Sequence, residues 1–249
     1  MQNKLIVIGG SSGIGKAIAH RFAEEGWQVM IGAPDWTAVK EVVKELPGTG
    51  HQAHAIDLAD ATSIQRFAGV VKKEFGTFHS LVNSAGVSGG EPINEPDWEL
   101  WRRPLEIMLF GAARLCRALI PLLEDGGRVI HITSIHHERV VYGSSAYGMA
   151  KAAVTQLTRS LAVELAPRQI LANAIAPGFV DTPMSVKGGK NELESQWFHD
   201  NYVKYDHLPL KRPAQPEEIA GVAWFLAGPD ASYITGSVLT VDGGLTITF

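Results

Sequence analysis

The sequence contains a single cysteine, Cys116, among its 249 residues. One cysteine cannot form an intramolecular disulfide, so a disulfide-stapled secreted scaffold is excluded. Cys116 lies in an apolar, helix-like stretch, which favours a buried inert thiol over a nucleophile. We therefore expect a protein of a reducing compartment, the cytoplasm, that folds around an apolar core.

Long apolar runs and clusters of basic residues are also missing. No segment approaches the roughly 18 consecutive apolar residues that span a bilayer. The apolar run Leu5–Ile8 near the N-terminus is too short for a signal peptide. No run of Lys or Arg exceeds two residues, and the formal net charge is −4. Neither a membrane nor a nucleic acid is therefore expected as a partner.

Apolar residues make up 45% of the chain, and they fall into short runs that alternate with helical patterns. The runs are rich in branched side chains and apolar on both faces, which is typical of buried parallel strands. We expect strands at Leu5–Ile8, Val29–Ile31, Ala53–Ile56, Leu81–Val82, Val129–Ile132, Leu171–Ile175 and Val238–Val241. Helical periodicity is clear in Gly15–Glu25, Thr62–Phe75, Leu105–Leu123 and Ala146–Ala166. The pattern predicts one α/β domain over residues 1–249: a Rossmann-type, doubly wound parallel sheet of about seven strands with helices on both faces.

One region, from Ser185 to Lys211, breaks this alternation, because it is polar and aromatic. It follows the carboxyl end of a predicted strand, where open α/β sheets bind their ligands. We interpret residues 185–211 as a mobile substrate lid, since long loops in compact domains are usually functional. The alternative is an ordinary surface insertion with helical turns.

A glycine-rich turn connects the first predicted strand to the first predicted helix. It reads Gly9-Gly10-Ser11-Ser12-Gly13-Ile14-Gly15. Glycines at such a turn let the backbone approach a pyrophosphate, and free N–H groups at the helix start attract its charge. The position between strand and helix strengthens a motif that is weak on its own. Lys16 is followed by Ala17, so the ending of a nucleoside-triphosphate loop is absent.

Three polar residues along the second half of the chain predict acid/base chemistry. Ser134 ends a predicted strand, and Tyr147 and Lys151 stand four residues apart on a predicted helix, hence on one face. An ammonium beside a phenol stabilises the phenolate and lowers the tyrosine pKa toward neutrality. A Tyr and a Lys at this spacing also occur as an ordinary surface pair. The glycine turn and the serine together favour the catalytic interpretation, with no metal at the site.

These motifs resemble the short-chain dehydrogenase/reductase family over essentially the whole chain. The glycine turn is similar to the family's cofactor turn, although Ile8 stands where threonine is usual, and Val241-Asp242-Gly243-Gly244 is similar to its C-terminal signature. Asn83-Ser84-Ala85-Gly86 resembles its Asn-Asn-Ala-Gly segment. The resemblance implies a cofactor site formed by Gly9, Ser11, Ser12, Gly13, Ile14, Gly15, Asp57, Leu58, Asn83, Ala85, Gly86, Tyr147, Lys151, Pro177, Gly178, Val180 and Thr182.

The resemblance also implies a function and a set of catalytic residues. The chain would be an NAD(P)-dependent oxidoreductase that interconverts a secondary alcohol and a ketone by hydride transfer. Tyr147 would exchange the substrate proton, Ser134 would hydrogen-bond the substrate oxygen, and Lys151 would hold the nicotinamide ribose. The protein itself would supply orientation and electrostatics.

One departure from the family pattern concerns its fourth catalytic residue, an asparagine in the long central helix. Alignment on Trp101 and Gly111 puts Met108 at that place. A thioether donates no hydrogen bond, so a water relay from Lys151 through this side chain is not expected. We expect proton exchange by another route, through backbone carbonyls and water. The alternative is a non-catalytic dinucleotide-binding relative with a weakened site.

A second departure concerns the choice between NAD and NADP. After the second strand the family often carries an acid for NAD or an arginine for NADP. This chain has Ala33-Pro34-Asp35, and no basic residue lies within the glycine turn. Asp35 would repel a 2′-phosphate, so the sequence favours NAD, with NADP as the alternative.

The small-molecule substrate is less well defined. Ser134-Ile135-His136-His137-Glu138 and Asp242-Gly243-Gly244-Leu245-Thr246 resemble glucose 1-dehydrogenase-like members of the family. A sugar or polyol would suit His136 and Glu138, which are equally interpretable as solvated loop residues. Met184 and Trp197 are further candidates for substrate contact, and an aromatic lid would equally suit a ketone with an apolar arm.

One competing hypothesis is an enzyme of another class on the same scaffold: a lyase, an epimerase or a dehalogenase. Dehalogenase relatives usually lose the glycine turn, which is intact here, and sugar-nucleotide epimerases generally have longer chains.

The sequence also carries an expectation about assembly. The segments Leu105–Leu123 and Ala152–Leu165 are apolar over more than one face. Family members commonly form tetramers on those helices, so a homotetramer with two-fold axes is expected.

Overall fold

The computed structural model describes residues 2–248, which form one α/β domain around a seven-stranded sheet. Every pairing within that sheet is parallel, and the strand order is β3-β2-β1-β4-β5-β6-β9. The strands are β1 (Lys4–Ile8), β2 (Gln28–Ala33), β3 (Gln52–Ala55), β4 (Phe78–Asn83), β5 (Leu123–Ile132), β6 (Leu171–Pro177) and β9 (Val238–Val241). The predicted doubly wound parallel sheet, with strands at all seven expected places, is thereby confirmed.

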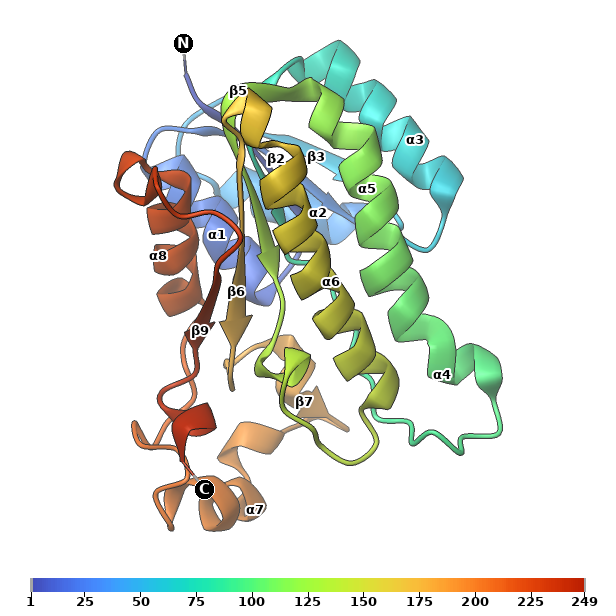
Figure 1. The fold of residues 1–249 in the computed structure, drawn as a ribbon, viewed down its shortest axis with the longest axis vertical. Coiled ribbons are helices and arrows are strands. Elements are labelled where there is room, and N and C mark those ends of the chain that lie inside the picture. Colours follow the sequence, from blue (N-terminus) through green and yellow to red (C-terminus); the bar gives the residue numbers. More distant parts are fainter. Residues whose placement is uncertain (1, 249) are drawn as a thin grey trace.

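Helices cover both faces of the sheet (Figure 1). The first face carries α1 (Gly13–Glu24), α2 (Trp36–Glu45) and α8 (Pro216–Ala227), and the second carries α3 (Ala61–Val70), α5 (Gly111–Leu119) and α6 (Ser145–Glu164). In β1, Leu5 and Val7 join the core on the first face, whereas Ile6 and Ile8 join the core on the second. This double burial explains why the strands read as continuous apolar runs.

Aspartates begin three of the helices and fix where the preceding loops end. The side chains of Asp35, Asp60 and Asp97 accept hydrogen bonds from backbone N–H groups in the first turns of α2, α3 and α4 (Trp98–Pro104), respectively. Such a cap satisfies an otherwise unpaired donor and stabilises a helix by about 1 kcal/mol. Asp35, the residue expected to influence cofactor choice, therefore has a structural partner, the Ala38 amide, at 3.0 Å.

A long helical segment runs from α4 into α5 and contains a π-helical stretch at Leu105–Phe110. The π-helical stretch follows directly on Pro104, which lacks the N–H that would continue the α-helical bonding. Met108 lies within it and is 2% exposed. The backbone irregularity thus falls at the position where the sequence departs from the family pattern.

The segment that was interpreted as a lid is compact and partly regular. It contains a two-stranded antiparallel hairpin, β7 (Val186–Lys187) and β8 (Lys190–Asn191), and the short helix α7 (Gln196–Phe198) followed by a π-helical turn at His199–Val203. Phe198 is buried, and its ring lies 5.0 Å from that of Phe179. Figure 1 shows this segment below the carboxyl ends of the strands, beside the C-terminal residues of the chain. Within residues 2–248, no helix has the length and apolar character to cross a membrane.

Candidate active site

A cleft of about 1350 Å³ lies at the carboxyl ends of the strands. The strand order reverses beside β1, because the chain passes from β1 to β2 and β3 on one side and returns to β4 on the other. Loops diverge at such a reversal and leave a crevice, which is where open α/β sheets bind their ligands. Most residues singled out in the sequence line this cleft: Gly9, Ser11, Ser12, Gly13, Ile14, Asp57, Leu58, Ala85, Gly86, Ser134, His136, Tyr147, Lys151, Pro177, Gly178, Val180, Thr182, Met184 and Trp197.

The glycine turn fits a pyrophosphate by its backbone geometry. Gly9 has φ +81°, and a Cβ added there would lie 2.7 Å from the Ala85 backbone. A Cβ added to Gly15 would lie 2.2 Å from the Gly9 carbonyl oxygen, so neither position accepts a side chain. Ser12 precedes α1 without a side-chain cap, and the first turn of α1 holds no acidic residue. The amides at this helix start are therefore available to an anion.

Two of the expected cofactor residues, Gly15 and Asn83, do not line the cleft. Gly15 is the site of close packing between the helix start and the turn. Asn83 is 5% exposed and its side-chain oxygen accepts a hydrogen bond from the Ala85 amide at 3.2 Å. Both residues shape the backbone that forms the cleft wall, and the Asn83 side chain is already engaged by the Ala85 amide.

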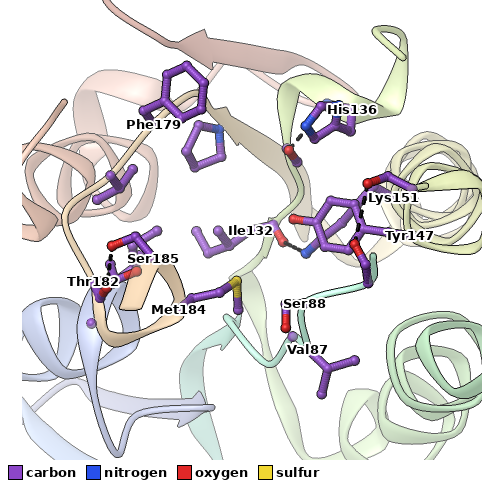
Figure 2. Close-up of a pocket in the computed structure, with 18 of the residues that line it drawn as sticks. Val87, Ser88, Ile132, His136, Tyr147, Lys151, Phe179, Thr182, Met184 and Ser185 are labelled. Atoms are coloured by element: carbon purple, nitrogen blue, oxygen red, sulfur yellow. Dashed lines mark hydrogen bonds between the residues drawn. The ribbon is translucent and has the colours of Figure 1, made fainter. Parts of the chain in front are cut away.

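Ser134, Tyr147 and Lys151 lie together on one wall of the cleft. Ser134 follows β5, while Tyr147 and Lys151 lie one turn apart on α6, which packs against the end of that strand. The Lys151 ammonium donates a hydrogen bond to the Ile132 carbonyl oxygen at 2.9 Å and lies 5.6 Å from the centre of the Tyr147 ring. Figure 2 shows these two side chains next to each other, with the bond from Lys151 to Ile132 drawn.

Burial dominates the electrostatics of this trio. It raises the pKa of Tyr147, and the opposing effect is the hydrogen bond with the Ser134 side chain, which lowers it. Burial also lowers the pKa of Lys151 to about 8. The expectation that Lys151 lowers the pKa of Tyr147 is therefore wrong for this structure, because both groups are short of water and the ammonium is turned toward the Ile132 carbonyl.

Met108 lies where Lys151 and the Gly86 backbone meet. A Cβ on Gly86 would stand 3.5 Å from the Met108 sulfur and 3.7 Å from the Lys151 nitrogen. The thioether therefore fills the space beside the ammonium without offering it a strong hydrogen-bond acceptor. The backbone carbonyl of Ile132 is the acceptor that Lys151 uses instead.

Behind Lys151 lies a buried polar chain that the sequence did not single out. His131 Nδ1 is 2.9 Å from the Thr158 hydroxyl, which itself donates to the Val154 carbonyl oxygen at 2.8 Å. His131 therefore donates from Nδ1, and its Nε2 accepts from the Cys116 thiol at 3.6 Å. Burial, followed by the charge of Lys151, lowers the pKa of His131 to about 4. His131 stands within the otherwise apolar end of β5, so no pattern in the sequence pointed to it.

The other side of the cleft is formed by the loop after β6 and by residues 185–202. Thr182, Met184 and Ser185 face Tyr147 and His136 across the space in Figure 2. The His136 ring meets the Tyr147 ring edge-on at 5.9 Å between centres, and burial lowers the pKa of His136. Trp197 is 63% exposed at the cleft. All three candidate substrate residues thus line the cleft that contains Tyr147.

Several lining residues carried no recognisable signal in the sequence. Arg103, Arg139 and Thr246 come from α4, from the loop after the turn Ile135–His137, and from the C-terminal region. No fixed spacing connects them, because tertiary packing alone brings them together. The Arg139 guanidinium donates to the Thr246 carbonyl oxygen at 2.5 Å across 107 positions of sequence.

Fold and site together define a dinucleotide-dependent oxidoreductase, with a pyrophosphate turn and a Ser, Tyr and Lys group on facing parts of one cleft. Comparison with known proteins gives the family. The model of the family described as enoyl-(acyl carrier protein) reductase matches residues 9–246. The chain belongs to the short-chain dehydrogenase/reductase family, whose members use NAD(H) or NADP(H).

Individual relatives match over nearly their full length. The chain is 36% identical over 252 residues to the uncharacterized oxidoreductase YxbG of Bacillus subtilis, covering 98% of this chain and 92% of that protein. It is 34% identical to the glucose 1-dehydrogenase of Gluconobacter oxydans, with the same coverage. A solved short-chain dehydrogenase/reductase from Serratia marcescens superposes with a TM-score of 0.88 at 34% identity, covering 98% of each chain.

These relatives decide between the broader readings of the sequence. They are named dehydrogenases, reductases and oxidoreductases, so this chain is an oxidoreductase of the short-chain family that acts on CH–OH groups. The alternative of a non-catalytic dinucleotide-binding protein receives no support from them.

Proposed function

We propose that the protein interconverts a secondary alcohol and a ketone with Tyr147 as the general acid and base. The observation that carries this proposal is the position of Tyr147 on the cleft wall, between the Ser134 hydroxyl and the Lys151 ammonium. In alcohol oxidation the substrate O–H proton passes to the Tyr147 oxygen, and in ketone reduction it returns. Ser134 holds the substrate oxygen by a hydrogen bond and so fixes which face of the carbon is presented.

The bound nicotinamide would accept the hydride from the alcohol carbon or donate it to the ketone carbon. The chain's own contribution is binding and electrostatics. Lys151 would donate a hydrogen bond to the ribose of the cofactor, and the hydrogen bond with the Ser134 side chain is the contact that favours the Tyr147 phenolate. Met108 supplies no relay, and the Ile132 carbonyl, 2.9 Å from the Lys151 nitrogen, accepts the hydrogen bond of the ammonium without carrying a proton onward, so the proton would leave through water.

We propose NAD as the preferred cofactor. Ala33 and Pro34 line the cleft after β2, and Asp57 and Leu58 line it after β3. None of these four side chains is basic, whereas a 2′-phosphate is usually met by an arginine. The nearby Lys16 is engaged by Glu45 at 2.6 Å.

For the substrate we propose a polyhydroxylated or aryl-substituted carbinol that enters beneath residues 185–211, which act as a lid. Support for a sugar or polyol comes from His136 beside Tyr147 and from the resemblance to a glucose 1-dehydrogenase. Support for an apolar arm comes from Trp197, Phe198 and Tyr202, which line the cleft from the lid.

The proposal is tested by following the absorbance of reduced nicotinamide with NAD or NADP and a panel of sugars, polyols and secondary alcohols. Tyr147→Phe should lower kcat by about 10²–10⁴-fold, the usual contribution of general acid/base catalysis. Binding of the cofactor, measured by calorimetry, should change little. Turnover retained in Tyr147→Phe would refute the assigned role, and a higher kcat/KM with NADP would overturn the choice of NAD.

We further propose that the protein works in the cytoplasm as a homotetramer. A lone buried cysteine suits a reducing compartment. The outer faces of the α4–α5 segment and of α6 carry exposed Phe110, Met149 and Val163. Contact between copies of the chain would remove these side chains from water.

A further inference from the structure

Two arginines on the cleft wall near Tyr147 are not neutralised by carboxylates. Arg103 and Arg139 both line the cleft and are exposed. Among residues 2–248, no Asp or Glu oxygen comes within 4.0 Å of either guanidinium, whereas Arg102 and Arg212 each have such a partner. Cations that line a concave surface without counter-charges attract anions to it.

The segments that carry the two arginines pack close to the proposed acid/base. Pro104 follows Arg103, and a Cβ on Gly89 would stand 3.3 Å from Pro104 Cγ and 3.2 Å from Tyr147 Cβ. The carbonyl oxygen of Arg139 lies 3.3 Å from Nδ1 of His136, whose ring contacts the Tyr147 ring. Both arginines thus line the same cleft as Tyr147, and they come from two different elements.

One of the arginines is also held in place. The Arg139 guanidinium donates to the Thr246 carbonyl oxygen at 2.5 Å. A guanidinium has five N–H donors, so this bond restricts the group and still leaves donors for a ligand. The planar fork of donors matches the oxygens of a carboxylate or a phosphate.

The charge of the whole cleft supports an anionic ligand. The lining cations are Arg103, Arg139, Lys151, Lys187 and Lys190, and the lining acids are Asp57 and Glu192. The cleft thus has an excess of positive charge in a chain whose formal net charge is −4. Glu192 is already engaged by Lys187 at 3.0 Å.

The cofactor's pyrophosphate does not account for the two arginines. The glycine turn lies against the opposite wall, because a Cβ on Gly13 would stand 3.1 Å from Thr182 Cγ2. Figure 2 shows Thr182 across the space from Tyr147 and His136. Phosphate charge at the turn is therefore met by the start of α1, and the two arginines are left without a partner from the pyrophosphate.

From these contacts we propose that the preferred substrate carries an anionic group, a carboxylate or a phosphate, which Arg103 and Arg139 bind while Tyr147 serves the carbinol or carbonyl carbon. This inference rests on the proposed alcohol/ketone chemistry. It makes the two arginines determinants of specificity, so their removal should weaken recognition of the anion and leave the chemical step with neutral ketones in place.

The test uses ketone pairs that differ in charge: levulinate and methyl levulinate, 4-acetylbenzoate and its methyl ester, and dihydroxyacetone phosphate and dihydroxyacetone. The wild type should have a kcat/KM about 10-fold or more higher for the charged member of a pair, as a charged hydrogen bond supplies. Arg103→Gln combined with Arg139→Gln should abolish that preference and change kcat/KM for the neutral member by less than about 3-fold. Arg66→Gln, at an exposed position of α3 outside the cleft, is the matched control and should retain the preference.

A binding measurement separates this inference from the chemistry on which it rests. Calorimetry with cofactor-saturated Tyr147→Phe should show tighter binding of 4-acetylbenzoate than of its methyl ester, and the difference should disappear when both arginines are replaced. Turnover of neutral ketones without a charge preference would overturn the inference and leave the proposed function intact. Equal binding of both members of each pair, or binding of neither, would also overturn it. A preference confined to one kind of pair identifies the anion as carboxylate or phosphate.

Discussion

At the residue scale, Met108 combines an unusual side chain with a demanding environment. It is 2% exposed within a π-helical stretch, and its sulfur adjoins the place where the Lys151 ammonium meets Gly86. Met108→Asn should lower the free energy of unfolding by about 1–3 kcal/mol, because the amide would be buried in a space fitted to a thioether. Urea denaturation measures the change.

Met108→Leu is the matched control, because it keeps an apolar side chain of similar volume and should cost less than about 1.5 kcal/mol. If Met108→Asn proved as stable as Met108→Leu, the pocket would have to hold a partner for the amide. A relay through Lys151 would then be recoverable at this position by a single substitution.

His131 makes folding sensitive to acid. Its pKa is lowered to about 4 by burial and by the charge of Lys151, whereas an exposed histidine titrates at 6.5. Between these two values the unfolded chain binds more protons than the folded one, so the free energy of unfolding rises with pH across this window. The full difference is about 3 kcal/mol. Urea denaturation between pH 4.5 and 7 measures it.

The variant His131→Gln lacks this titration and should show a flatter dependence on pH, even though it is less stable at pH 7 than the wild type. Lys151, with a pKa lowered to about 8, affects stability between that value and the ordinary lysine value, so its contribution does not overlap. Identical slopes for wild type and His131→Gln would contradict the assignment.

At the scale of elements, the lid segment has one side chain that holds it to the domain, Phe198, and one that faces the cleft, Trp197. Phe198 is buried against Phe179 and Tyr202, while Trp197, its neighbour, is 63% exposed at the cleft. Trp197→Ala should raise KM for acetophenone about 3–10-fold and affect 2-butanone less, because the aromatic contact is lost. Its free energy of unfolding should stay within about 0.5 kcal/mol of the wild type.

Tyr233→Ala is the control for Trp197→Ala, since Tyr233 is fully exposed and lies outside the cleft. Steady-state kinetics with both ketones compare the two variants. An equal rise in KM for acetophenone and 2-butanone, or a rise in Tyr233→Ala as well, would argue against a direct contact between the lid and the substrate.

The elements also explain what could be predicted from the sequence. Strands buried on both faces read as apolar runs, so β1 to β6 and β9 were all found, although β5 begins at Leu123 and not at the expected Val129. Each strand of the hairpin Val186–Asn191 is only two residues long and largely exposed, so the hairpin produces no apolar pattern in the sequence. The helices α2 and α4 are short and begin at aspartate caps that resemble ordinary loop residues.

The candidate site was predictable where chemistry depends on local spacing. The glycine turn is one continuous stretch, and Tyr147 and Lys151 share a helix face, so their place at the cleft follows from the sequence. Arg103 and Arg139 come from separate elements, and only the packing of α4 against α6 and of Arg139 on Thr246 brings them into one cleft with Tyr147. The pKa of Tyr147 was mispredicted because spacing along a helix does not report burial.

At the scale of the whole molecule, the outer surface of α6 predicts assembly. Val163 is 77% exposed and Met149 is 54% exposed on the face turned away from the sheet. Light scattering should give a mass near four times the 26.9 kDa of one chain. Val163→Asp should lower that mass, because a carboxylate is costly to bury between copies. Ile93→Asp, at a 72% exposed loop residue, should leave it unchanged, and a monomer mass for the wild type would refute the tetramer.

The reactivity of Cys116 reports how often the native structure opens locally. Its thiol is 2% exposed, and burial raises its pKa to about 12, so the native state offers almost no thiolate at neutral pH. A thiol reagent can therefore react only after α5 has separated from β5. The rate of labelling then measures how often this local opening occurs. A cysteine introduced at the exposed Lys190 would be the fast-reacting thiol of the native protein. A fluorophore attached there would report movement of residues 185–211, because the buried Cys116 would stay unlabelled.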